Sequence, residues 1–140
     1  MSKEKFLTES ELVNLASDFG KKLIPGDIVY LLGDLGAGKT TFVRALLKSL
    51  GVSGLIKSPT YTLVENYFIN NKIFSHLDLY RLKDPSELEN IGISDLVSNK
   101  HILLIEWPEQ GRGFIPDPTY ILELSHHSSD PNFRGFKYVK

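Results

Sequence analysis

The stretch DIVYLLGDLGAGKT, residues 27–40, decides the fold of this chain because it joins three kinds of local structure. Residues 27–32 form a short run that is apolar on both faces, as expected of a strand buried between two layers of helices. A glycine-rich turn follows, and apolar residues at helical spacing then predict a helix over residues 39–50, with Gly51 suited to its end. A strand, a glycine turn and a helix in this order open a parallel α/β sheet.

The turn itself carries a phosphate-binding motif. Residues 33–40, Gly-Asp-Leu-Gly-Ala-Gly-Lys-Thr, fit the pattern G-x-x-x-x-G-K-[ST] at every position. The glycines let the backbone curl so that successive amides point at a phosphate, and the helix N-terminus adds a partial positive charge. Lys39 would reach the β- and γ-phosphates, and the Thr40 hydroxyl would take one Mg²⁺ position. We expect a nucleoside triphosphate here; the alternative is a plain glycine-rich turn with an exposed lysine.

Regions on either side of this unit extend the predicted fold. Thr8 and Glu11 fit a capping box, so we expect a helix that opens at Thr8 and ends at Pro25-Gly26. The aromatic and β-branched segments 61–69 and 72–80 predict an antiparallel hairpin inserted into the sheet. Later elements are expected as a short helix with Pro85 at its first position, ending near Asn90 and Gly92, and as strands over residues 101–105, 120–124 and 133–139.

These elements predict an α/β, P-loop NTPase fold with a mainly parallel central sheet and flanking helices. A length of 140 residues, with 41% hydrophobic and 24% charged residues, predicts one domain over residues 1–140. The net charge of −1 argues against independent capture of nucleic acid or of an anionic membrane. Because the chain has no cysteine and no run resembling a signal peptide or a membrane span, we expect a cytoplasmic protein that binds no membrane.

Two carboxylates follow predicted strands, and nucleotide hydrolysis or transfer needs such groups. Glu106 could hold Mg²⁺ or its bound water at the carboxyl end of a strand, where α/β sheets place ligands. Asp78 could orient the attacking water or share the metal. The alternatives are an Asp78 that pairs with Arg81 in the hairpin and a Glu106 that is a surface acid ending a strand.

The segment Ser58-Pro59-Thr60 lies between the predicted P-loop helix and the next strand. P-loop hydrolases carry a segment that responds to the γ-phosphate at this position, although the residues alone indicate only a Ser-Pro turn. The four histidines show no metal-ligand spacing, and we expect solvated or hydrogen-bonded side chains for them.

The sequence resembles the TsaE (YjeE) family, small bacterial P-loop ATPases needed to form threonylcarbamoyladenosine on tRNA. The resemblance extends from about Thr8 to Pro118, and its last three blocks are together more specific than the P-loop. The blocks occur in order at the family's spacing: GDLGAGKTTF at 33–42, KSPTYTLVE at 57–65, HLDLYRL at 76–82 and IEWPE at 105–109.

The resemblance implies a set of site residues. The catalytic residues would be Lys39, Asp78 and Glu106, with Asp78 at the Walker B position, and the metal residues would be Thr40, Glu106 and Asp78. The switch-like segment would be Ser58, Pro59 and Thr60. The nucleotide would be held by Glu9 near the base, by Asp34, Leu35, Gly36, Ala37, Gly38, Lys39, Thr40 and Thr41, by Trp107, and by Arg134, which stands nearest to the family's late Gly-Arg.

The resemblance also implies a slow ATP hydrolase that uses ATP and Mg²⁺ and acts on the partner proteins TsaB and TsaD, reaching tRNA only indirectly. A small-molecule or nucleoside kinase is the alternative that the P-loop and the two carboxylates also permit. The absence of arginine between Lys83 and Lys100 speaks against a kinase lid. A third hypothesis is a binding module in which ATP only orders residues 58–61 for a partner.

Overall fold

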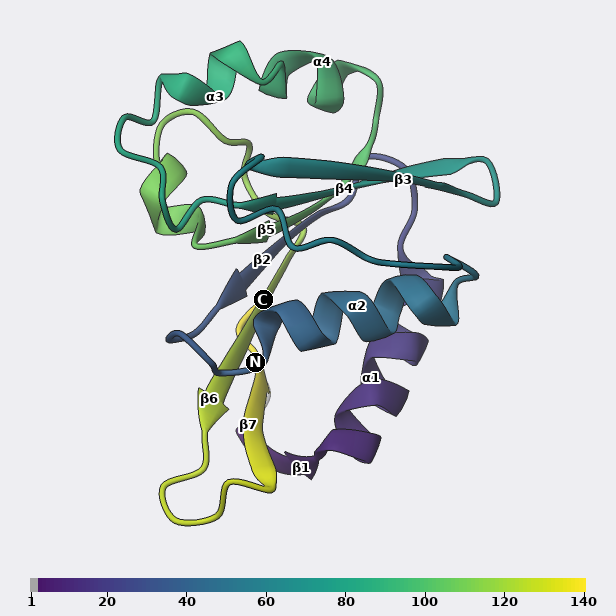
Figure 1. Ribbon diagram of the computed structural model, residues 1–140, viewed down its shortest axis with the longest axis vertical. Helices are drawn as coiled ribbons and strands as arrows, with labels where there is room; N and C mark the ends of the chain where they lie inside the picture. The colour runs from purple at the N-terminus through teal and green to yellow at the C-terminus, as the bar shows by residue number, and fades with distance from the viewer. Residues whose placement is uncertain (1–2) are drawn as a thin grey trace.

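A computed structural model describes residues 3–140 (Figure 1). Within them, seven strands form one mixed sheet in the order β1-β7-β6-β2-β5-β4-β3. The strands are β1 (Lys5–Thr8), β2 (Ile28–Leu32), β3 (Val64–Ile69), β4 (Lys72–Asp78), β5 (Ile102–Glu106), β6 (Tyr120–His126) and β7 (Phe133–Tyr138). The helices are α1 (Glu9–Lys22), α2 (Lys39–Ser49), α3 (Glu87–Asn90), α4 (Ile93–Ser98) and the 3-10 helix η1 (Pro108–Gly111).

Parallel pairing is confined to the four central strands. β2 lies between β5 and β6 and runs parallel to both, and β4 runs parallel to β5. The sheet is extended by antiparallel pairs on both sides, β3 beyond β4 and β7 with β1 beyond β6. The predicted hairpin is present, but it lies at one side of the sheet: β4 joins the parallel strands and β3 forms the outer edge. The predicted α/β fold is confirmed, with antiparallel pairs flanking its parallel centre.

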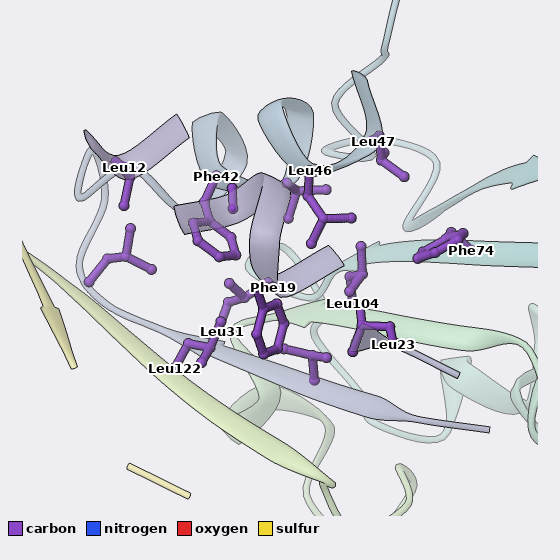
Figure 2. Packing of buried hydrophobic residues seen from close by; sticks show 14 of the residues in the cluster. Leu12, Phe19, Leu23, Leu31, Phe42, Leu46, Leu47, Phe74, Leu104 and Leu122 are labelled. Atoms are coloured by element: carbon purple, nitrogen blue, oxygen red, sulfur yellow. The ribbon is translucent and has the colours of Figure 1, made fainter. Parts of the chain in front are cut away.

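Helices cover both faces of the sheet (Figure 1), which is why the central strands are apolar on both sides. α1 and α2 pack on one face, where Phe19 and Leu46 point toward Leu31 and Leu104 of the strands (Figure 2). On the other face α3 and α4 pack against β4 and β5 through a second cluster that includes Leu88. Burying an aliphatic or aromatic side chain of this kind contributes about 1.5–3 kcal/mol.

The capping box at the start of α1 is confirmed. Thr8 Oγ1 accepts from the Glu11 amide at 3.2 Å, and Glu11 Oε1 accepts from the Thr8 amide at 2.9 Å. These bonds satisfy two backbone donors that the first turn of a helix leaves unpaired. The helix ends at Lys22, three residues before Pro25.

Several elements differ from the sequence-based expectations. Residues 61–63 form a turn before β3, and η1 was not predicted. The short α-helix begins at Glu87 and not at Pro85, because the backbone before it forms tight turns whose bonds span three residues: the Glu87 amide donates to the Asp84 carbonyl at 2.9 Å and the Leu88 amide to the Pro85 carbonyl at 3.1 Å. Strand β1 and helix α4 were not predicted. Each has six residues or fewer, so neither is long enough to show a periodic pattern.

No helix within residues 3–140 has both the length and the apolar character needed to cross a membrane.

Candidate functional site

A cleft of about 850 Å³ opens where the central strands end. Its walls come from the P-loop, the start of α1, the segment 58–60, the ends of β4 and β5, and the turn between β6 and β7. Such a crevice beyond the carboxyl ends of parallel strands is where open α/β sheets bind ligands.

The P-loop keeps a shape that depends on its glycines. Gly33, Gly36 and Gly38 have φ angles of 144°, 75° and 107°, which L side chains rarely adopt. A Cβ at Gly33 would also lie 2.4 Å from the carbonyl oxygen of Leu124 on β6, so this glycine allows the loop to pack on the sheet. Gly38 is the N-cap of α2 and supplies no side chain to cap it. The positive end of the helix dipole therefore faces the cleft without a side-chain partner.

Lys39 is almost fully buried, with 4% of its surface exposed. Its ammonium group donates to the Gly33 carbonyl and lies 3.8 Å from the centre of the Trp107 ring. Burial lowers the pKa of Lys39, and the negative charges of Glu106 and other nearby acids partly counter that effect. The P-loop and Trp107 together hold this amine at the cleft wall.

The Thr40 hydroxyl and the Glu106 carboxylate meet at the floor of the cleft. Thr40 Oγ1 lies 3.1 and 3.0 Å from the two carboxylate oxygens of Glu106. On its other side, Glu106 Oε2 lies 2.6 Å from Nε2 of His76. Glu106 is 3% exposed, so the alternative of a surface acid at a strand end is wrong.

Asp78 stands beside Glu106, because the two residues are paired in register across the parallel strands β4 and β5. Burial raises the pKa of Asp78, while the Tyr80 amide, which donates to Oδ1 at 3.1 Å, lowers it. Within residues 3–140, Asp78 forms no ion pair with Arg81, whose guanidinium instead lies 4.9 Å from the centre of the Tyr61 ring. The hairpin ion pair is thus not formed.

Oxygen atoms from Thr40, Asp78 and Glu106 therefore border one part of the cleft. Magnesium prefers oxygen ligands, and it is commonly held by one or two carboxylates together with phosphates and water. The residues present fit Mg²⁺ bound to a nucleotide phosphate.

The segment 58–60 borders the same cleft as Asp78. Ser58 and Thr60 line the cleft, and their hydroxyl oxygens are 2.8 Å apart. Pro59 is buried, and its carbonyl accepts from the Leu63 amide at 2.9 Å. The Leu63 carbonyl in turn accepts from the Asp78 amide at 3.1 Å. Two backbone hydrogen bonds thus connect this segment to the carboxylate strand.

The remaining predicted nucleotide-binding residues divide into two groups. Glu9, Leu35, Gly36, Gly38, Thr41, Trp107 and Arg134 line the cleft. Asp34 and Ala37 do not: Asp34 is exposed, and Ala37 is packed in the core. Arg134 donates to the carbonyls of Pro131 and Phe133 at 2.9 and 3.1 Å, which holds it at the rim near Gly38.

Two histidines belong to this region although the sequence singled out neither as a site residue. His76 binds Glu106 as described above, and its position two residues before Asp78 on one strand face was an available signal. His126, at the end of β6, has its Nε2 3.0 Å from the Leu35 carbonyl of the P-loop. The two residues of that contact are 91 positions apart, and no local pattern connects them.

Comparisons with known proteins show which family the chain belongs to. The family model described as threonylcarbamoyl adenosine biosynthesis protein TsaE matches residues 6–134. The tRNA threonylcarbamoyladenosine biosynthesis protein TsaE of Haemophilus influenzae is 50% identical over 105 residues, 75% of this chain and 66% of the relative. The proteins of the same name from Rickettsia conorii and Borreliella burgdorferi are 39% and 40% identical, over 91% and 80% of this chain and 71% and 82% of those relatives.

The fold is also found among solved structures. The crystal structure of Bacillus subtilis YdiB matches with a TM-score of 0.77 at 23% identity, and the match covers 99% of this chain and 86% of that one. Because the family model matches residues 6–134 and these relatives are 39–50% identical, the chain belongs to the TsaE family of threonylcarbamoyl adenosine biosynthesis proteins.

Proposed function

We propose that this protein is a Mg²⁺-dependent ATPase that supports threonylcarbamoyladenosine formation on tRNA by acting on a TsaB–TsaD complex. The family match supports the place in tRNA modification. The observation that carries the ATPase activity is the meeting of Lys39, Thr40, Asp78 and Glu106 in one cleft at the N-terminus of α2. These groups are the ones that hydrolysis of a nucleoside triphosphate requires.

The P-loop would bind the triphosphate. Its backbone amides and the open N-terminus of α2 supply hydrogen-bond donors and positive potential. Lys39 would leave the Gly33 carbonyl for the β- and γ-phosphates, and the aromatic wall formed by Trp107 would keep water away from the amine. Phosphate oxygens would accept hydrogen bonds from the Lys39 ammonium group and so replace the water that burial has removed from it.

Hydrolysis would need a bound metal and a group that accepts a proton. Thr40 and Glu106 would hold Mg²⁺, which when bound neutralises charge on the β- and γ-phosphates. In the hydrolytic step a water oxygen bonds to the γ-phosphorus, the bond to ADP breaks, and the proton lost by the water goes to a carboxylate. Asp78 suits that role, because burial raises its pKa and it lines the cleft.

The segment 58–60 would report the state of the nucleotide to the partner proteins. Ser58 and Thr60 line the cleft, and the side chain of the next residue, Tyr61, is exposed at the protein surface. Segments ordered by a γ-phosphate and released on hydrolysis are a common switching device. A partner that binds the ordered form of this segment would thereby be coupled to ATP turnover.

Hydrolysis is favoured over transfer to a small acceptor by the position of α3 and α4. Their side chains pack on the face of the sheet opposite to α1 and α2, against Leu77, Leu103 and Ile105. All of residues 83–100 are described by the structure, and none of them lines the cleft. This position supports a site whose phosphoryl acceptor is water.

The test is multiple-turnover threonylcarbamoylation of tRNA by purified TsaB and TsaD, with and without this protein and ATP. We expect product to stop near one turnover without the protein, and the Lys39→Ala variant to behave like its absence. Lys48→Ala, on an exposed position of the same helix, is the matched control and should support full turnover. The proposal fails if omitting the protein changes nothing, or if radioactive γ-phosphate is recovered on an acceptor other than water.

A further inference from the structure

We propose that His76 is a positioning residue for the metal site and that its Nε2–H holds the Glu106 carboxylate toward Thr40. This inference rests on the proposed function, because it takes Glu106 to serve Mg²⁺. His76 differs from the residues assigned above in two respects: it is fully buried, at 0% exposure, and it does not line the cleft. Any effect on the metal must therefore pass through Glu106.

The geometry places the carboxylate between two donors from different elements. His76 and Asp78 lie on the same face of β4, since side chains alternate along a strand. His76 is paired in register with Leu104 of β5, so its ring lies close to the side chain of Glu106 farther along that strand. Nε2 is 2.6 Å from Oε2, and the Thr40 hydroxyl approaches both oxygens from α2.

The second ring nitrogen of His76 fixes the position of the proton. Nδ1 is buried and has no hydrogen-bond partner within the described residues. A proton on Nδ1 would be a buried donor without an acceptor, which is unfavourable, so the proton resides on Nε2 and points at Glu106.

The unpartnered Nδ1 also argues against a purely structural role. An apolar side chain of similar size would fill the same space and leave no polar atom unsatisfied. What the imidazole adds over such a side chain is the hydrogen bond from Nε2 to Glu106. Groups that donate to metal-binding carboxylates orient them, and their loss typically weakens metal affinity about 10–100-fold. Within residues 3–140, the side chain of His76 makes its hydrogen bond to Glu106 and none to the P-loop, so phosphate binding without metal should not depend on it.

The test measures binding of ATP to the full chain by calorimetry, once in Mg²⁺ and once in EDTA, and the Mg²⁺ concentration that gives half-maximal binding. His76→Leu removes the donor, His76→Gln keeps an N–H near the position of Nε2, and His76→Asn places its amide near Nδ1, too short to reach Glu106. His101→Leu is the control, because His101 also contacts strand β4, through Ser75 at 2.8 Å, but does not touch Glu106.

We expect the leucine and asparagine variants of His76 to need about 10–100-fold more Mg²⁺, with ATP affinity in EDTA unchanged. The glutamine variant should stay near wild type, and His101→Leu should change neither quantity. Equal losses with and without Mg²⁺ would indicate a folding role and overturn the inference. A His76→Gln variant that needs as much Mg²⁺ as the His76→Asn variant would also overturn the inference. If His76→Leu does not fold, the comparison of the glutamine and asparagine variants still tests it. If the wild type itself binds ATP without any dependence on Mg²⁺, the proposed function fails, and this inference is overturned with it.

Discussion

The backbone amide of Asp78 donates a hydrogen bond to the carbonyl of Leu63, 3.1 Å away. Leu63 has a φ of 67°, which is unusual for a non-glycine residue, and its amide is bound to the carbonyl of Pro59. The segment that lines one wall of the cleft is therefore fixed to the strand that carries the carboxylate. A displacement of residues 58–60 would strain the hydrogen bond at Asp78, which gives a physical route between this segment and the site.

Asp78 should make the stability of the protein depend on pH. Burial raises its pKa above the ordinary value of 3.8, so the folded state keeps this proton at pH values where the unfolded chain has lost it. The free energy of unfolding contributed by Asp78 therefore falls as the pH rises through the window above 3.8. Asp78→Asn, which keeps an oxygen for the Tyr80 amide, should be more stable than wild type at pH 7 and lose that advantage toward pH 4. Urea denaturation at a series of pH values measures this.

An Asp78→Asn variant whose stability differs from wild type by the same amount at every pH would show that Asp78 titrates alike in the folded and unfolded chain.

Replacing Glu106 should separate nucleotide binding from turnover. In Glu106→Gln the amide cannot serve Mg²⁺ as a carboxylate does, so hydrolysis should fall at least about 100-fold, the scale of losing one electrostatic group of an active site. Binding of ATP in EDTA should persist, because the P-loop is intact. Phosphate release and calorimetry measure the two quantities. Glu89→Gln, at an exposed position of α3 outside the cleft, is the control and should hydrolyse ATP at the wild-type rate. A Glu106→Gln variant that turns over at the wild-type rate would exclude Glu106 from the chemistry.

Gly33 should tolerate no side chain. Gly33→Ala would place a Cβ 2.4 Å from a backbone oxygen that cannot move away easily, in addition to the strain of a positive φ. We expect a loss of about 1–3 kcal/mol in the free energy of unfolding from the overpacking alone. Gly51→Ala has a similar φ of 112° but meets nothing within 4 Å, so it reports the strain by itself. Equal losses in the two variants, measured by urea denaturation, would show that the loop can shift away from β6.

His126 should contribute to ATP affinity through the P-loop. His126→Ala removes the hydrogen bond to the Leu35 carbonyl, and one such bond contributes about 0.5–1.5 kcal/mol. We expect ATP binding to weaken about 2–10-fold, which calorimetry can detect. The neighbouring His127 packs against the Phe6 ring at 4.9 Å, so His127→Ala is the control. The same affinity loss in both variants would place the effect in the β6–β7 turn rather than in the P-loop bond.

The sequence predicted the elements whose pattern is local and strong. The P-loop, β2 and α2 follow from the motif at residues 33–40 and the apolar periods on either side of it, and the capping box of α1 follows from four adjacent residues. Asp78 and Glu106 could be selected because both follow buried strands. β1 could not be predicted, because its four residues are held mainly by pairing with β7 near the other end of the chain.

By itself, then, the sequence determined the α/β fold, the phosphate loop and which acidic residues stand at strand ends, because each of these follows from a pattern among a few neighbouring residues. Only the tertiary structure decided which of those groups meet. The contacts of Glu106 with Thr40 and His76 join residues 66 and 30 positions apart, and they depend on strand register and on the packing of α2 against the sheet. Spacing along a chain does not specify such distances, because they arise only when separate elements pack into one core.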